Sequence, residues 1–495
     1  MNLHTASICC AAAVAAASAA SACTGAYVGK KVSEDGSVLL CRTVDSTPWT
    51  SCHRLSVAPR VENAPGRIFT GKRGCRWELP ATTWKVVSTP RLKSLNRGCY
   101  ASACVNERGL AVTGTVTGKP GDIVAELDPF VEKGFAEESL PGLLALCCST
   151  AREAVELLGK AVADQGHWGA EIYMFADNEE AWYVEVYSGH QWAAVRMPDD
   201  KVACFGNQMM IQSFDPASPD TISSPALISL PEKAGKLVRG ADGLPDLRAT
   251  YAQPLDDYGN LRTWFGHRTF APSTAGGEYA TSRPMPLFFA PERKIGRQDV
   301  FELFRSRFEG SGWCPEETGD LTIRVIGTTK QATCHVIAVD PSLPAARRCT
   351  IWATFANAEH SVFLPVNAAV TDVAKSFALD QEGEFRFDGE IPGMAFRRLC
   401  ALSEQNRRWY GAGVRAFWHA RETQLLAEFP KVLASGSAAE LTSFCSSAQA
   451  EAFGDAKRIF DDLMWYISAN NRIEGDGSGA TSQPQAPFSV ATPRR

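Results

Sequence analysis

Residues 23–46 read CTGAYVGKKVSEDGSVLLCRTVDS. Two apolar runs in this stretch flank Asp35-Gly36, a dipeptide typical of tight turns. The pattern therefore predicts a β-hairpin whose first strand follows Cys23 directly. A hairpin brings the two ends of such a stretch together, so we expect Cys23 to lie near Asp45.

The length of the hairpin loop decides which residue faces Cys23. A two-residue loop places it across from Pro48, and a four-residue loop places it across from Ser46. In either register Asp45 lies within a few residues of the thiol. Arg42 lies further back by roughly 10 Å, at about 3.4 Å per residue, a gap that an extended arginine can span. A cation and a carboxylate are thus expected beside Cys23.

The residues before Cys23 resemble a removable leader. Residues 1–22 read MNLHTASICCAAAVAAASAASA, with an apolar core and a small-x-small ending at Ala20-Ser21-Ala22. Cleavage after Ala22 would place a thiol nucleophile and its α-amine base on one amino acid. A signal peptide would export the chain to the periplasm or outside the cell, whereas a self-removed propeptide would leave it in the cytoplasm. The pattern favours the signal peptide.

A lipid anchor is the alternative use of Cys23. Ala-Ser-Ala-Cys loosely resembles a bacterial lipoprotein box, in which the cysteine carries diacylglycerol. A secreted or anchored binding protein would then replace the enzyme. The strand-like TGAYVGK that follows at once argues against this, because no polar tether separates the cysteine from the fold.

Composition limits the classes of partner. The chain has 495 residues, of which 45% are hydrophobic and 21% charged, as in ordinary globular proteins. A net charge of −5 gives no reason to expect nucleic acid or an anionic membrane as partner. After residue 22 no apolar run is long enough to span a membrane. Whether the chain forms a homo-oligomer stays open.

The cysteines and histidines predict no metal centre and no cofactor. The chain has 16 cysteines without a C-x-x-C pair, and its histidines are scattered without an H-E-x-x-H motif. In an oxidising compartment Cys52 could pair with Cys75, or Cys99 with Cys104. The spacing does not choose among connectivities.

The rest of the chain predicts an α+β domain of stacked layers. We expect a hairpin over 100–117, a helix over 140–162 and an irregular segment over 213–285. An antiparallel meander is expected over residues 171–176, 181–187, 191–197 and 201–206. Asn207 follows its last strand, where a side chain can project into a cleft. Glu185 and His190 are candidates for contact with polar groups of a substrate, although His190 falls in an expected turn.

Several separated motifs resemble the bacterial cysteine N-terminal-nucleophile dipeptidases. This family is related to the secernins and, more distantly, to choloylglycine hydrolase and penicillin V acylase. The first motif is CTGAYVGKK with Asp-Gly-Ser and Arg42-x-x-Asp45. It is followed in order by NE-x-GLA at 106–111, AREAV at 151–155, DNEEAW with EVYSGHQW over 177–192, Asn207, the 295–307 helix and 361–365.

The resemblance implies a four-layer αββα fold and metal-independent hydrolysis of dipeptides or related amides. It assigns Cys23 as nucleophile, with Arg42 and Asp45 holding its amine and thiolate, and Asn207 as an oxyanion-hole donor. An acylase acting on non-peptide amides of the bile-salt or penicillin V type would share these residues. The resemblance covers roughly residues 23–400, which we take as the hydrolase domain after the leader (1–22). A helical, amphipathic pattern predicts a helical extension packed on it (401–469), and the Gly/Ser/Pro/Gln-rich composition predicts a disordered tail (470–495).

Overall fold

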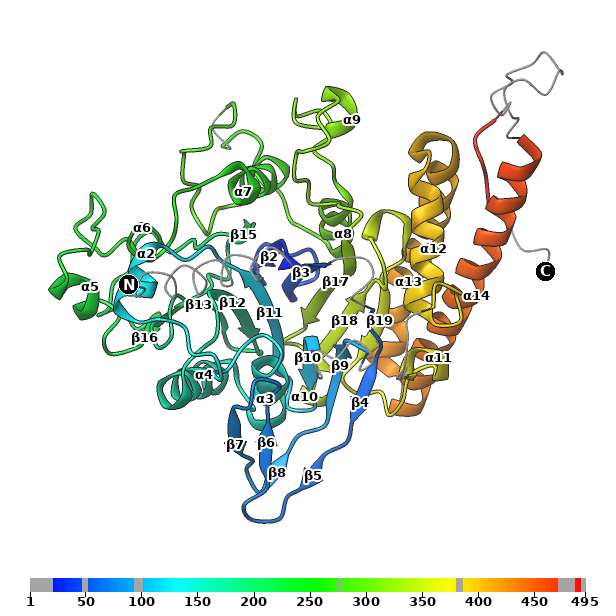
Figure 1. The fold of residues 1–495 in the computed structure, drawn as a ribbon. Coiled ribbons are helices and arrows are strands. Elements are labelled where there is room, and N and C mark those ends of the chain that lie inside the picture. The colour runs from blue at the N-terminus through cyan, green and yellow to red at the C-terminus, as the bar shows by residue number, and fades with distance from the viewer. Residues whose placement is uncertain are drawn as a thin grey trace, which may run out of the picture.

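Two β-sheets lie face to face at the centre of the protein, and helices cover the outer face of each sheet (Figure 1). The computed structural model describes residues 21–46, 52–92, 101–274, 277–379, 386–470 and 486–490. The sheets meet through β3, which contacts β11 and β12, and through β18, which contacts β10. The expected α+β class and αββα layering are confirmed.

The first sheet has the strand order β15-β2-β3-β17-β18-β19, with β1 also paired to β3. Every residue of β3 and of β17 is buried, because both faces of this sheet are covered. The strands are β1 (Ser21–Ala22), β2 (Gly25–Val28), β3 (Val38–Ser46), β15 (Val202–Phe205), β17 (Gln331–Val339), β18 (Cys349–Ala353) and β19 (Leu364–Asn367).

The second sheet has the order β16-β14-β13-β12-β11-β10-β9-β4. Its strands are β4 (Ser56–Ala58), β9 (Val86–Pro90), β10 (Ala101–Asn106), β11 (Ala111–Thr117), β12 (Glu171–Ala176), β13 (Ala181–Val186), β14 (Trp192–Arg196) and β16 (Thr221–Ser223). Two small ribbons pair β5 (Val61–Glu62) with β8 (Thr82–Thr83) and β6 (Ile68–Thr70) with β7 (Arg76–Glu78). The hairpin expected over 100–117 is β10 and β11.

The first hairpin has a register that neither loop length predicted. Ala22 lies across from Asp45 in the pairing of β1 with β3, and β2 continues the same line. The next residue, Cys23, therefore lies level with Val44. The connection over residues 29–37 is longer than either expected loop because it folds back on itself with turn hydrogen bonds of its own. The expected proximity of Cys23 and Asp45 holds nonetheless.

The expected four-stranded meander is wrong at its last strand. Strands β12, β13 and β14 pair in order within the second sheet. Strand β15 instead crosses to the first sheet, where Ala203 pairs with Tyr27 of β2. The alternation of residues within β15 does not reveal which sheet the strand joins, because its partner β2 is distant in the sequence. The crossing carries Asn207 to the same end of the sheet as Cys23.

Helices α3 (Leu140–Cys147) and α4 (Ala151–Gln165) cover the second sheet. The single helix expected over 140–162 is therefore two, because Thr150 caps α4 by accepting a hydrogen bond from the Glu153 N–H at 3.2 Å. Helices α7 (Asp257–Phe270) and α8 (Arg297–Arg305) contact the first sheet. The short helices are α2 (Asp122–Leu127), α5 (Ser229–Lys233), α6 (Leu247–Tyr251), α9 (Pro315–Thr318), α10 (Ala345–Arg348), η3 (Ala358–His360) and α11 (Lys375–Ala378).

The C-terminal helices flank the β19 edge of the first sheet (Figure 1). They are α12 (Pro392–Glu404), the π-helix η4 (Arg407–Gly411), α13 (Ala412–Ser435) and α14 (Ala438–Asn470). Within the expected disordered tail, residues 486–490 pack on these helices: the Phe488 ring is buried and its N–H donates to the Trp409 carbonyl at 2.8 Å. Burial of the apolar Phe488 ring stabilises this segment, which the composition of the tail did not predict. The other tail residues after Asn470, and residues 1–20 of the leader, lie outside the described part.

Two further expectations concern cysteines and membranes. The suggested pairing of Cys52 with Cys75 is not present, because both thiols are free, and Cys104 is free as well. Cys99 lies outside the described residues. In the same ranges, no helix combines the length and apolar character needed to cross a bilayer.

Candidate active site

Cys23 lies fully buried between β1 and β2, where three expected site residues meet. Its backbone N–H donates to Asn207 Oδ1 at 3.1 Å. Its Sγ lies 3.7 Å from Arg42 Nη2, which donates toward the sulfur. The hairpin supplies Arg42 and the crossing of β15 supplies Asn207. The thiol, a backbone nitrogen, a cation and an amide thus converge at one point.

The Asn207 side chain uses both ends of its amide. Its oxygen accepts from Cys23 and, at 2.7 Å, from Arg262 Nη2. Its nitrogen donates to the Thr117 carbonyl at 2.9 Å. An amide nitrogen carries two N–H groups, so one stays available for another acceptor. Its predicted role as an oxyanion donor stays a prediction; the geometry adds a role in holding the Cys23 nitrogen.

Asp45 is buried beneath Cys23 and pairs with a residue that sequence reasoning missed. Arg324 Nη2 contacts Asp45 Oδ2, whereas Asp45 Oδ1 has no donor among the described residues. Burial raises the pKa of Asp45, an effect that the Arg324 and Arg262 guanidinium groups oppose. Asp45 lies across the ladder from Ala22, one residue from Cys23. Its carboxylate is therefore placed to accept a hydrogen bond from the α-amine that cleavage after Ala22 would create.

Arg262 joins these groups and was also missed. Its Nη1 donates to the Cys23 carbonyl at 2.6 Å and to Thr24 Oγ1 at 3.1 Å, while its Nη2 binds Asn207. Burial lowers the pKa of Arg262 to about 10, so it stays charged at neutral pH. The guanidinium fork therefore fixes Cys23 and the Asn207 amide relative to each other.

The helix that carries Arg262 was hidden within the expected irregular segment. Helix α7 is buried on nearly every side, so its sequence lacks the polar and apolar faces by which a surface helix is recognised. The available signal was Asp256, which caps the helix by accepting from the Gly259 N–H at 3.1 Å. A capping aspartate before an arginine-bearing apolar run could have indicated a buried helix.

Glu185 is fully buried, and its carboxylate is occupied by the protein. It accepts from the Tyr183 and Tyr187 hydroxyls at 2.6 and 2.7 Å and from the Met210 N–H. Burial raises the pKa of Glu185. These contacts anchor the segment that follows Asn207. Substrate contact by Glu185 stays a prediction, and the structure gives it a positioning part.

His190 lies in the turn between β13 and β14, as its sequence context indicated. Its Nδ1 is 2.8 Å from Asp128 Oδ1, and its side chain is partly exposed. Burial raises the pKa of Asp128, but hydrogen bonds from Ser188 and His190 outweigh this effect and lower it. Among the described contacts none joins His190 to the Cys23 group, so its part in substrate binding also stays a prediction.

A small pocket, open to solvent, lies beside Asn207. Cations and a carboxylate line it together with apolar side chains. The lining residues are Lys119, Asn207, Gln208, Met209, Arg248, Ala252, Gln253, Pro254, Leu255 and Asp256. A substrate placed here would lie against the amide that holds the Cys23 nitrogen.

The family model described as "Peptidase family C69" matches residues 22–408. This match covers most of the chain and begins one residue before Cys23. The chain belongs to peptidase family C69. The membership confirms the resemblance to bacterial cysteine dipeptidases and the expectation of a hydrolase that acts on peptide bonds.

Named relatives of this C69 peptidase include probable dipeptidase B of Lactococcus lactis, 30% identical over 73% of this chain and 77% of the relative. Probable dipeptidase B of Streptococcus pyogenes is 27% identical over 74% of this chain and 75% of the relative. A probable dipeptidase of Salmonella dublin is 27% identical over 70% of this chain and 80% of the relative. Among solved structures, a mutant conjugated bile acid hydrolase of Clostridium perfringens matches 74% of this chain and 96% of its own at 10% identity, with a TM-score of 0.26.

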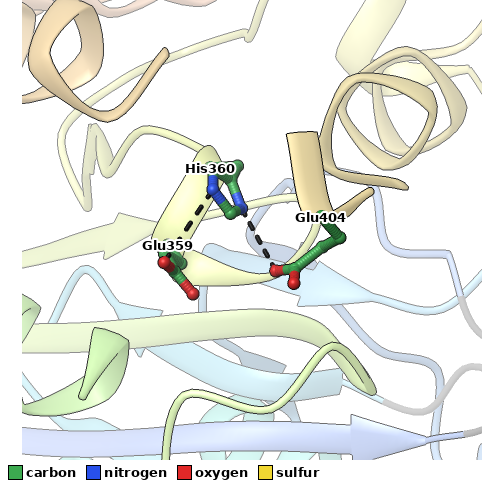
Figure 2. A group of neighbouring side chains, drawn as sticks. All are labelled: Glu359, His360 and Glu404. Carbon is green, nitrogen blue, oxygen red and sulfur yellow. Dashed lines mark ion pairs between the residues drawn. The ribbon is translucent and has the colours of Figure 1, made fainter. Parts of the chain in front are cut away.

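Away from Cys23, the C69 peptidase gathers Glu359, His360 and Glu404 from η3 and α12 (Figure 2). Their ligand atoms lie within 4.8 Å of one another, a spacing that could hold a metal ion. However, Arg307 Nη2 is 2.7 Å from Glu359 Oε2 and 2.5 Å from Glu404 Oε1. Arg407 Nη2 is 2.6 Å from Glu359 Oε1. Arginines already match both carboxylates, so the group fits a buried ion-pair network better than a cation site.

Replacing Glu404 by glutamine is expected to destabilise the protein by roughly 3 kcal/mol at neutral pH. Burial alone would raise the pKa of Glu404, but His360 and Arg307 outweigh it and lower the pKa from 4.5 to about 2. A carboxyl with a lowered folded-state pKa contributes stability above its unfolded pKa and loses it as the pH falls toward the folded one. The difference between the variant and the wild type should therefore shrink below pH 4.5.

Urea unfolding of both proteins across the acidic range measures this difference in stability. Glu390 provides the control, because its carboxylate pairs with Lys457 at 3.2 Å but its side chain is 71% exposed. Glu390→Gln should change the free energy of unfolding by less than about 1 kcal/mol. Equal stability of Glu404→Gln and wild type at neutral pH would show that the network contributes little.

Proposed function

We propose that this C69 peptidase is a metal-independent cysteine dipeptidase whose nucleophile is Cys23, made N-terminal by removal of residues 1–22. One observation carries the proposal: the Cys23 nitrogen and thiol, which become base and nucleophile, are held by Asn207 and Arg42 in a buried site. Family membership and the dipeptidase names of the relatives support the substrate class.

The leader must leave before this chemistry can start. In the full chain β1 pairs with β3, and the Cys23 nitrogen belongs to the peptide bond from Ala22. An amide nitrogen cannot accept a proton at neutral pH, whereas a free α-amine with an ordinary pKa of about 7.7–8.0 can. Cleavage after Ala22 therefore creates the base. Asp45 Oδ1, which has no donor among the residues that the structure describes, offers the new amine an acceptor.

The first half of the reaction forms a thioester. The α-amine takes the thiol proton, and Arg42 stabilises the negative charge on Sγ. The sulfur attacks the amide carbon of the dipeptide, and the carbonyl oxygen becomes an oxyanion. The second N–H of Asn207 can donate to it, a contribution of about 2.7–4 kcal/mol in comparable sites. The α-ammonium then protonates the leaving nitrogen as the C–N bond breaks.

The second half of the reaction releases the acyl residue. Water attacks the thioester carbon while the α-amine accepts one of its protons. The C–S bond breaks, the acyl residue leaves as a carboxylic acid, and the amine returns the proton to the thiolate. Arg262 holds Cys23 and Asn207 in place throughout. Each step uses side chains and the α-amine of this chain.

The test is to express the full chain in an exporting host and measure the N-terminal residue and mass of the product. We expect an unmodified Cys23 at the N-terminus and hydrolysis of dipeptides. The activity should persist in EDTA and be lost on treatment with iodoacetamide. A lipid adduct on Cys23 would contradict the proposal, and so would activity that disappears in EDTA and returns with a divalent metal.

A further inference from the structure

Arg248, on the pocket wall beside Asn207, has hydrogen-bonding capacity that the protein does not use. Its side chain is 15% exposed, and its Nε is buried without a partner. Its Nη2 forms an ion pair with Asp246 Oδ2 at 3.7 Å, a distance too long for a hydrogen bond. Among the residues that the structure describes, the guanidinium makes no hydrogen bond. The Nη groups can therefore still donate hydrogen bonds to an acceptor from outside the chain.

The position of Arg248 relative to Asn207 is fixed by the backbone. The Arg248 N–H donates to the Ile211 carbonyl at 2.8 Å, which ties α6 to the segment that follows Asn207. The opposite wall is joined to the end of α6, because the Gln253 N–H donates to the Lys119 carbonyl at 3.0 Å. The cation is therefore part of a built pocket rather than a surface side chain that happens to lie near.

Gln208 lines the same pocket and is held in place by the protein. It is 8% exposed, and its Nε2 lies 3.3 Å from Asn260 Oδ1 and 3.2 Å from Thr263 Oγ1. Its Oε1 is covered by the protein beside Gly259, so a ligand in the pocket does not reach it. Gln208 therefore helps to hold the wall in place, and the donors that the pocket offers to an anionic ligand are the Nη groups of Arg248.

We propose that Arg248 binds the free α-carboxylate of the leaving residue and thereby selects dipeptides; this inference rests on the proposed function. A guanidinium binds a carboxylate through two parallel hydrogen bonds. In a dipeptide the free carboxylate lies one residue beyond the scissile carbonyl, about 3.8 Å along the chain. An arginine in the pocket that the oxyanion donor Asn207 also lines therefore suits it. Longer peptides would place a neutral amide against the cation.

An acidic side chain of a substrate would offer the same chemistry, so the test separates the two sources. We would measure kcat/KM for alanyl-alanine, alanyl-alanine amide and aspartyl-alanine amide with the wild type, Arg248→Gln and Arg248→Lys. The wild type should prefer the free acid over the alanyl amide by about 10- to 100-fold, mainly through KM. Arg248→Gln should lose this preference without losing activity on the amide, and Arg248→Lys should retain part of it.

The control is Arg239→Gln, which removes an exposed arginine of the same segment that pairs with Glu232 at 2.8 Å outside the pocket. It should keep the full preference for the free acid. An unchanged preference in Arg248→Gln would overturn the inference. The inference would equally be overturned if the wild type hydrolysed aspartyl-alanine amide as efficiently as alanyl-alanine and Arg248→Gln did not. Arg248 would then bind an acidic side chain of the substrate and not its α-carboxylate.

Calorimetric binding of the same three ligands to Cys23→Ala protein makes the inference independent of turnover. Binding of alanyl-alanine that exceeds that of its amide, and that Arg248→Gln weakens by about 10- to 100-fold, supports the carboxylate site even if no hydrolysis is found. In that case the proposed dipeptidase function would be contradicted while the carboxylate site at Arg248 would be supported. Hydrolysis of dipeptides without any preference for the free acid would support the function and contradict the site.

Discussion

Replacing Cys23 by alanine is expected to abolish dipeptide hydrolysis, with a loss of at least about 10⁴-fold in kcat, as for other enzymes that lose a covalent nucleophile. In the proposed mechanism the residue supplies the sulfur that forms the thioester and, after cleavage, the amine that moves the proton. Cys23→Ser should recover only a small part of the activity, because it restores a hydroxyl with a higher pKa but keeps the amine. Steady-state kinetics on purified variants with a confirmed N-terminus measure both.

Cys147 offers a matched control for this prediction. It lies at the end of α3, is only half-buried, and burial raises the pKa of its thiol to about 12, so it carries little thiolate at neutral pH. Cys147→Ala should keep wild-type activity and the same sensitivity to iodoacetamide. If Cys23→Ala keeps substantial activity, or if Cys147→Ala removes it, the nucleophile has been assigned wrongly.

The second large effect is expected at Arg262. Arg262→Ala should lower kcat by about 10²-fold, because Cys23 and Asn207 lose the fork that holds them together. It should also lower stability by about 1–3 kcal/mol for each buried acceptor left without a donor. Arg262→Lys keeps the charge but not the fork and should recover stability more than kcat.

Thermal unfolding and steady-state kinetics together separate the two parts of this prediction. The control is Arg268→Ala, which removes an exposed arginine from the same helix; Arg268 donates to the Gly310 carbonyl at 3.2 Å. This variant should match the wild type in kcat. An Arg262→Lys variant that is fully active would mean that charge, and not the fixed geometry of the guanidinium, is what the site needs.

The sequence predicted the parts of the site that lie close together along the chain. Cys23, Arg42 and Asp45 belong to one hairpin, so strand geometry alone brings them together, even though the register was wrong. The register failed because the connection over residues 29–37 folds on itself, which the turn dipeptide does not reveal. Asn207 was placed by resemblance, since its strand pattern indicated the wrong sheet.

Arg262, Arg324 and Arg248 could not be found in this way. Each lies more than 200 residues from Cys23 along the chain, and each reaches the site or its pocket only through the packing of distant segments. A buried arginine looks the same in a sequence as a surface one. What distinguishes it is its set of acceptors, and these come from other elements.

The sequence by itself determined the hairpin that carries Cys23 and Arg42, the α+β class, the helical C-terminal region and the family, because local periodicity and contiguous motifs encode these features. Only the tertiary structure decided that β15 joins the first sheet, that α7 brings Arg262 to Cys23, and that arginines fill the Glu359 and Glu404 cluster. These outcomes depend on which buried surfaces and charges meet across the molecule. Such pairings are set by packing between distant segments and leave no periodic trace in the chain.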